Sequence, residues 1–250
     1  MSTGLPPAFI LAGGLGTRLA AAVPDRPKAL APIGARPFLD IVFDQLLGLG
    51  IERVVLLLGA RHEAILRFLA DRKSRRQGRP DLYVQTSIEP APLGTGGAVR
   101  FAHRFASEPF FLLNGDTYLD FDATALVTCH QEKDAIVTLA VSHQEDTARF
   151  GQVDVSPEGF VLGFREKAAS SGPGLINGGV YLMDPSLLAL IPDGRPVSLE
   201  QETFPRLLSQ GKRMAALPQR GDFFDIGTPE SHKAFAAFIG QTPPTRNTPL

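Results

Sequence analysis

Short apolar runs alternate with amphipathic segments through the first half of this chain. The strand-like runs lie at residues 9–12, 54–58, 82–86 and 110–113. The helix-like segments, with apolar residues at helical spacing, lie between them at residues 38–49, 62–69 and 98–105. This order predicts an α/β fold with a mostly parallel central sheet and helices on both of its faces. Ligands of such a sheet gather at the carboxyl ends of its strands.

The second half of the chain has a different pattern, with shorter connections between its strands. A helix is predicted near residues 123–130, and strands are predicted at residues 135–142, 151–155, 160–164 and 179–183. Two more helices, at residues 199–208 and 229–239, flank a short strand at 223–225. The short connections favour a smaller antiparallel part within one domain over residues 1–240. Residues 241–250 are rich in Pro and Thr and are predicted to form a disordered tail.

Charge and composition favour small ligands. The 25 Lys and Arg residues nearly balance the 26 Asp and Glu residues, so the chain lacks the basic surface that nucleic acid or an anionic membrane would need. No secretion signal is recognisable, and no apolar run reaches the roughly 18 residues of a spanning helix. The single Cys129 excludes an internal disulfide. These features predict a cytoplasmic protein that binds neither nucleic acid nor membrane.

A glycine-rich loop follows the first strand. Residues 11–19 read LAGGLGTRL, and backbone N–H groups in such a turn can cradle phosphate oxygens. A P-loop would need Gly-Lys-Ser/Thr at the end of the loop, and a dinucleotide site would need a third glycine where Leu19 stands. Neither condition is met. A phosphate site therefore competes with a simple tight turn, and Arg18 favours the phosphate site.

Two further positions carry charge where ligands are expected. Lys28 lies in a loop stiffened by Pro27 and Pro32, and its spacing from the glycine-rich loop favours a ligand role over a solvated surface position. Asp116 follows an apolar strand at the ligand edge of the sheet, where a carboxylate suits Mg²⁺. A turn or helix-cap role for Asp116 remains the alternative.

Six sequence elements, taken in order, closely resemble the fingerprint of the sugar nucleotidyltransferase family. They are residues 11–19 with Pro27 and Lys28, then EPAPLGTGGA at 89–98, LNGD at 113–116, FREK at 164–167, INGG at 176–179 and DIGTPE at 225–230. The resemblance covers nearly the whole chain. It implies a Rossmann-like nucleotide-diphospho-sugar transferase fold, dependence on Mg²⁺ and frequent homo-oligomerisation.

The resemblance also implies roles for individual residues. The catalytic charges would be Arg18, Lys28 and Lys167. The nucleotide would contact Leu11, Ala12, Gly13, Gly14, Gly16, Thr17, Arg18, Lys28, Gly94, Thr95, Gly96, Asn114 and Asp116. The sugar phosphate would contact Gly151, Glu166, Lys167, Asn177 and Gly178. Asp116 and Asp225 would share one Mg²⁺. The glycines of residues 93–97 would leave room for the base or would only form a turn. For Asn177–Gly178 the sugar pocket is slightly favoured over the alternative of a hairpin turn.

The implied reaction joins a nucleoside triphosphate to a sugar 1-phosphate and releases pyrophosphate. Within the family, the motifs look most like those of D-glycero-α-D-manno-heptose-1-phosphate guanylyltransferases, which favours GTP and that heptose phosphate as substrates. N-acetylmuramate-1-phosphate uridylyltransferase and mannose-1-phosphate guanylyltransferase are the alternatives. A regulatory homologue that binds nucleotide sugars without catalysis would be expected to have lost the phosphate and metal residues, but the charged residues are present here. Departures from the usual pattern, at residues 20–22 and at Ala29, leave the sugar and the base open.

Overall fold

The computed structural model describes residues 4–14, 26–76, 78, 81–165 and 172–241. The chain divides into two compact units. Unit 1 contains residues 1–92, 114–118 and 224–250, and unit 2 contains residues 93–113 and 119–223.

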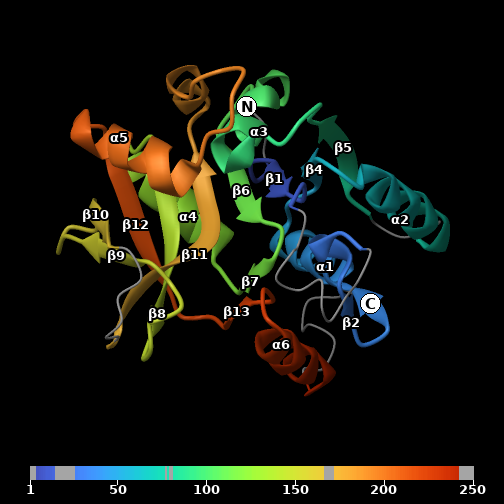
Figure 1. Cartoon of the computed structure of the whole chain (residues 1–250). Helices are drawn as coiled ribbons and strands as arrows, with labels where there is room; N and C mark the ends of the chain where they lie inside the picture. Colours follow the sequence, from blue (N-terminus) through green and yellow to red (C-terminus); the bar gives the residue numbers. More distant parts are fainter. Residues whose placement is uncertain (1–3, 15–25, 77, 79–80, 166–171, 242–250) are drawn as a thin grey trace. The chain divides into compact units, whose positions relative to one another are not determined.

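Unit 1 is built on three parallel strands, which Figure 1 shows side by side. The strands are β1 (Ala8–Leu11), β4 (Arg53–Leu58) and β5 (Tyr83–Ile88). The helices are α1 (Phe38–Leu49), α2 (His62–Arg75) and α6 (Pro229–Gln241). The shorter elements are η1 (Lys28–Leu30), β2 (Pro32–Ile33), β3 (Arg36–Pro37), β7 (Thr117–Leu119) and β13 (Phe223–Asp225). The parallel arrangement predicted from the alternating runs is confirmed.

The core of unit 1 explains why these runs form strands. Residues 54–58 of β4 are all apolar and at most 4% exposed, as expected for a parallel strand that is covered on both faces. Helices α1 and α2 pack against each other through Phe43 and Phe68, whose ring centroids lie 6.3 Å apart. Helix α1 ends at Leu49, because the next residue, Gly50, takes the left-handed conformation with φ of 82°.

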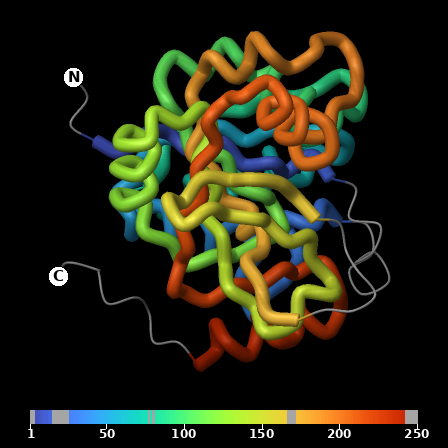
Figure 2. The backbone as a smooth tube through the Cα atoms, turned by 90° about the vertical axis from the view of Figure 1, so that its left-hand side faces the viewer, coloured from blue at the N-terminus to red at the C-terminus, as the bar shows by residue number. Residues whose placement is uncertain are grey.

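Unit 2 contains a largely antiparallel sheet. Its strands are β6 (Phe110–Asn114), β8 (Val137–Gln144), β9 (Gln152–Val155), β10 (Val161–Arg165), β11 (Gly174–Met183) and β12 (Met214–Gln219). Its helices are α3 (Gly94–Phe101), η2 (His103–Phe105), α4 (Ala123–Glu132), η3 (Pro185–Leu190), the π-helix η4 (Leu199–Thr203) and α5 (Phe204–Ser209). Strand β11 pairs antiparallel with β6, β8 and β9, and β12 pairs parallel with β8. Figure 2 shows β9 and β10 as adjacent yellow segments. The predicted antiparallel strands are confirmed.

The structure differs from the sequence-based expectation at several elements, among them α3, β11 and β12. Helix α3 begins at Gly94, four residues before the predicted start, because the carbonyl of Val197 accepts the Gly96 N–H at 2.8 Å and so supplies a cap from far along the chain. Strand β11 begins at Gly174, so Asn177 and Gly178 lie inside a strand and the hairpin-turn alternative is wrong. Strand β12 was not predicted, because Pro218 and Gln219 obscure its pattern and its pairing partner β8 is distant in sequence.

Candidate active site

The three parallel strands of unit 1 bring their carboxyl ends together around Glu89. The Ala12 N–H donates to the Leu57 carbonyl at 2.9 Å, so hydrogen bonding to β4 continues one residue beyond the end of β1. An ideal Cβ on Gly59 would lie 2.7 Å from Glu89 Oε1, and one on Gly13 would lie 3.0 Å from the Gly59 nitrogen. The absence of a side chain at both positions lets the Glu89 carboxylate and the two loops approach one another closely. The predicted phosphate loop thus begins beside a carboxylate.

The turn at Asn114–Asp116 also passes the end of β1. The Gly115 N–H donates to the Leu11 carbonyl at 3.0 Å, and a Cβ on Gly115 would lie only 2.2 Å from that oxygen. This close approach requires glycine and places Asp116 beside the carboxyl end of β1. Asn114 Oδ1 is buried and has no hydrogen-bond partner among the residues that the structure describes. The side chain has therefore kept acceptor capacity at this edge.

Lys28 joins the two carboxylates that were predicted to hold a metal. Its Nζ donates to Asp116 Oδ2 and lies 3.7 Å from Asp225 Oδ1. The Lys28 side chain is only 16% exposed, whereas those of Asp116 and Asp225 are 39% and 29% exposed. The backbone helps to hold the pair, because the Ile226 N–H donates to the Asp116 carbonyl at 3.0 Å. The group carries two negative charges and one positive charge at the ligand edge of the sheet, an arrangement suited to cations and phosphates together.

A metal at this position would need ligands beyond these two carboxylates. Among the described residues, the chain has no cluster of three His, Cys, Asp or Glu side chains that could hold an ion. Two carboxylates supply hard oxygen donors, which fit Mg²⁺, and phosphate oxygens of a bound nucleotide could complete the coordination.

In unit 2, the predicted base loop is packed against protein backbone. Gly94 has a φ of 70°, and a Cβ on it would lie 2.6 Å from the Val197 carbonyl oxygen. A Cβ on Gly96 would lie 3.2 Å from the same oxygen. These two glycines therefore allow the segment around Val197 to lie on the start of α3. These contacts give the two glycines a packing role at the start of α3, and their expected role beside the base stays a prediction.

The predicted sugar residue Asn177 lies at an irregularity in β11. The register between β11 and β8 shifts between Asn177 and Val180, as in a β-bulge, which redirects side chains locally. A Cβ on Gly178 would lie 2.8 Å from the Ala140 carbonyl oxygen, so glycine is needed for the bulge to pack on β8. Asn177 Nδ2 donates to the Tyr181 hydroxyl at 2.7 Å. Gly151, the third predicted sugar residue of unit 2, is exposed just before β9.

Several predicted site residues lie outside the described part of the chain. They are Gly16, Thr17, Arg18, Glu166 and Lys167. Gly14 is described and exposed. The roles of these residues stay predictions.

Three side chains at these sites were not singled out from the sequence. Glu89 directly follows β5, and this position at the ligand edge was a signal that could have found it. Glu200 accepts hydrogen bonds from Thr95 Oγ1 at 3.0 Å and from the Tyr181 hydroxyl at 3.3 Å. No local pattern marks Glu200 or Tyr181, because the contact with Thr95 joins residues 105 positions apart.

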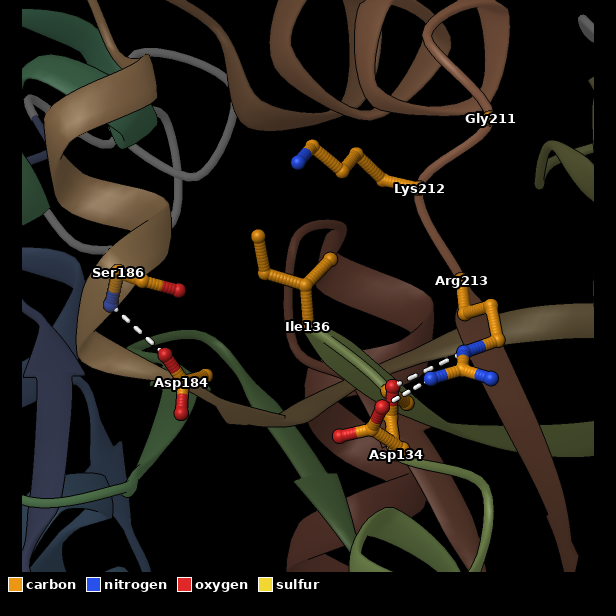
Figure 3. Close-up of a pocket in the computed structure, with 8 residues that line it drawn as sticks. Asp134, Ile136, Asp184, Ser186, Gly211, Lys212 and Arg213 are labelled. Carbon is orange, nitrogen blue, oxygen red and sulfur yellow. Dashed lines mark hydrogen bonds and ion pairs between the residues drawn. The ribbon is translucent and has the colours of Figure 1, made fainter.

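A separate polar hollow in unit 2 contains none of the predicted site residues. It is lined by Asp134, Ala135, Ile136, Asp184, Ser186, Gly211, Lys212 and Arg213. Figure 3 shows Arg213 paired with Asp134, and Asp184 accepting the Ser186 backbone N–H. The hollow lies where β8 and β12 begin, whereas Asn177 is paired with Val141 further along β8. Its acidic groups, Asp134 and Asp184, already have partners within the chain. Among the described helices, none is long and apolar enough to cross a membrane.

Comparison with known proteins places this geometry in a family. Residues 7–242 match the family model described as nucleotidyl transferase. The chain is 34% identical over 231 residues to D-glycero-alpha-D-manno-heptose 1-phosphate guanylyltransferase of Campylobacter jejuni, covering 91% of this chain and 97% of that protein. It is 32% identical over 230 residues to a probable mannose-1-phosphate guanylyltransferase of Oryza sativa, covering 90% of this chain and 62% of that protein.

The fold is shared with a solved nucleotide complex. The crystal structure of HddC from Yersinia pseudotuberculosis complexed with GMP-PN superposes with a TM-score of 0.80 at 28% identity, covering 94% of this chain and 100% of that chain. The expected α/β fold of the nucleotide-diphospho-sugar transferases is thereby confirmed. The chain belongs to the nucleotidyl transferase family.

Proposed function

We propose that this chain transfers a guanylyl group from GTP to a sugar 1-phosphate, with D-glycero-α-D-manno-heptose 1-phosphate as the favoured acceptor. The observation that carries the proposal is Lys28 between Asp116 and Asp225, next to the strand that leads into the glycine-rich loop. The similarity to a heptose 1-phosphate guanylyltransferase, and to HddC complexed with GMP-PN, supports this choice of acceptor and base.

The reaction forms one phosphorus–oxygen bond and breaks another. A phosphate oxygen of the sugar 1-phosphate attacks the α-phosphorus of GTP, and the bond from that phosphorus to the bridging oxygen breaks as pyrophosphate leaves. The attacking phosphate is already an anion, so no general base is needed. The chain contributes positioning and charge neutralisation, which dominate phosphoryl and nucleotidyl transfer. In this proposal, Lys28 contacts phosphate oxygens near the reacting phosphorus, while Arg18 balances charge on the pyrophosphate and Lys167 holds the acceptor phosphate.

Asp116 and Asp225 would hold Mg²⁺. Both carboxylates already lie against one cation, the Lys28 ammonium, so they fit a second cation once the phosphates of the substrate attract Lys28. Bound there, Mg²⁺ would supply Lewis-acid stabilisation of charge on the phosphate oxygens.

Glu89 supports guanine as the base. Its carboxylate lies against Gly13 and Gly59 at the edge where β1, β4 and β5 end. An ionised carboxylate offers two acceptor oxygens and no donor. Guanine presents two adjacent donors, N1–H and the N2 amino group, whereas uracil presents one N–H between two carbonyl acceptors. A carboxylate at a base site therefore pairs with guanine and repels uracil.

A substrate panel tests the proposal. Purified protein with Mg²⁺ is given GTP, ATP, CTP, UTP or dTTP together with heptose, mannose, glucose or N-acetylmuramate 1-phosphate, and pyrophosphate release is measured. We expect release only with both substrates present, and the highest kcat/KM with GTP and the heptose phosphate. A clear preference for mannose 1-phosphate with GTP would show that the proposed acceptor is wrong. A preference for UTP with N-acetylmuramate 1-phosphate would show that both the proposed acceptor and the proposed nucleotide are wrong. No release with any pair would favour a nucleotide-sugar-binding protein without catalytic activity.

A further inference from the structure

We propose that Glu200 is a positioning residue that couples the nucleotide subsite to the sugar-phosphate subsite. The inference rests on the proposed function, because it takes Thr95 to belong to the nucleotide subsite and Asn177 to the sugar subsite. All the residues involved lie in unit 2. Glu200 acts through these residues and need not touch either substrate.

The Glu200 carboxylate accepts hydrogen bonds on both oxygens. Oε2 accepts from Thr95 Oγ1 at 3.0 Å and from Ser198 Oγ at 3.2 Å, and Oε1 accepts from the Tyr181 hydroxyl at 3.3 Å. All three donors are neutral hydroxyls, so the arrangement is a directed hydrogen-bond network and not a salt bridge. The carboxylate spans the distance between the start of α3 and strand β11.

The direction of each hydrogen bond on the nucleotide side is fixed. The Thr95 hydroxyl accepts the Leu199 N–H at 2.8 Å. Because an ionised carboxylate can only accept, the single proton of this hydroxyl is directed to Glu200. Thr95 lies in the first turn of α3, and the Gly96 N–H donates to the Val197 carbonyl at 2.8 Å. Glu200 and the residues just before it therefore hold the start of this helix in place.

The direction is fixed on the sugar side as well. The Tyr181 hydroxyl accepts from Asn177 Nδ2 at 2.7 Å, so its single proton is also directed to Glu200. Asn177 Oδ1 accepts the Gly179 N–H at 3.0 Å, which fixes the orientation of the amide. Tyr181 itself is fully buried, so this chain of bonds runs through protein rather than through solvent. A shift of Glu200 would move both Asn177 and Thr95.

The network requires both oxygens of the Glu200 carboxylate to accept a hydrogen bond. Glutamine keeps the size of Glu200, but its amide nitrogen cannot accept a hydrogen bond, so in either orientation of the amide one of the two hydroxyls loses the acceptor for its proton. Glu200 also lies in η4, a π-helix, and such turns often occur at functional sites. A purely structural role for Glu200 predicts lower stability without a change in substrate binding.

Kinetics of four variants separate these possibilities. Glu200→Gln breaks the link, Thr95→Val removes the nucleotide arm and Tyr181→Phe removes the sugar arm. Glu202→Gln is the matched control, because Glu202 lies in the same π-helix but pairs with Arg195 at 3.0 Å, and this hydrogen bond lowers the pKa of its carboxyl. KM for each substrate, kcat and melting temperature are measured with the substrate pair that the wild type uses best.

We expect Glu200→Gln to raise KM for both substrates by about 5-fold or more, within the usual range of couplings between sites. Thr95→Val should raise mainly the KM for nucleotide, and Tyr181→Phe mainly the KM for sugar phosphate. In the Glu200→Gln background neither change should add its full effect, since residues of one network are not additive. Glu202→Gln should match the wild type.

The proposal is overturned if Glu200→Gln lowers the melting temperature while both KM values stay within about 2-fold of wild type. It is also overturned if the effects of Thr95→Val and Tyr181→Phe on KM are the same in the Glu200→Gln background as in the wild type. Failure of the proposed function is a separate result, because it appears in the wild type. If the wild type shows no activity with any substrate pair, the same variants are compared by the rise in melting temperature that GDP-mannose causes. Absence of that rise in the wild type would also refute the proposal, since there would be no subsites to couple.

Discussion

Lys28 is the residue whose charge the proposed chemistry needs most directly. Lys28→Met keeps the aliphatic stem but leaves Asp116 and Asp225 facing each other without the ammonium. Loss of charge-assisted bonds, each worth about 1.5–3 kcal/mol, should reduce kcat/KM about 10- to 100-fold. Steady-state pyrophosphate release measures the effect. Lys212→Met is the control, because Lys212 is exposed in unit 2 outside the site. Equal rates for the two variants would remove Lys28 from the reaction.

Glu89 is the residue expected to determine the selectivity for guanine over uracil. Glu89→Gln replaces one acceptor oxygen by a donor, which weakens pairing with the two donors of guanine and relieves repulsion of the uracil carbonyls. We expect the ratio of kcat/KM for GTP over UTP to fall by about 10-fold or more, as when one charged hydrogen bond is lost. Competition between the two nucleotides gives the ratio directly. An unchanged ratio would show that another residue reads the base.

At the scale of elements, helix α4 and strand β8 enclose a histidine that makes stability depend on pH. His130 is 6% exposed and its Nδ1 lies 2.9 Å from Thr138 Oγ1. Burial lowers the pKa of His130 below its ordinary value of 6.5, although Asp184 and Asp134 oppose the shift. Above that value the unfolded and folded chains both hold a neutral imidazole. Below it the unfolded chain gains a proton that the folded chain resists, so this group lowers stability as pH falls from about 6.5 toward the folded pKa.

The expected outcome is a smaller loss of stability in His130→Gln than in the wild type between about pH 7.5 and 5.5. Glutamine does not titrate and can still bond Thr138. Urea denaturation at each pH gives the free energies of unfolding. His143→Gln is the control, because the His143 side chain is 58% exposed. Parallel curves for His130→Gln and the wild type would mean that folding does not lower the pKa of His130.

At the scale of the whole molecule, folding brings together Lys28 and Asp116, which are 88 positions apart, and adds Asp225 from near the end of the chain. If the two carboxylates bind Mg²⁺, Asp225→Asn should raise the Mg²⁺ concentration for half-maximal activity about 10-fold or more, because one charged ligand is lost. Titration of activity with MgCl₂ measures this, and melting curves check the fold. Asp222→Asn, at an exposed neighbouring position, is the control. An unchanged magnesium requirement in Asp225→Asn would leave Asp225 a purely structural partner of Lys28.

The sequence by itself determined those features that depend on neighbouring residues. The apolar runs of β1 and β4 and the helical spacing of α1 come from local periodicity, and the structure has them at nearly the predicted bounds. The positions of Lys28 and Asp116 were also predictable, because a loop at the carboxyl end of a parallel strand faces the ligand edge. Resemblance to a family supplied the role of Asp225, which no local pattern shows.

Only the tertiary structure decided how distant segments share these sites. Nothing in the sequence near Gly94 and Gly96 indicates that the segment at Val197 packs against them. Glu200 has no local signal, yet it joins Thr95 to Tyr181. Periodicity records which face of an element is buried but not which distant segment covers it. That choice is made by long-range packing and hydrogen bonding, which exist only once the chain has folded.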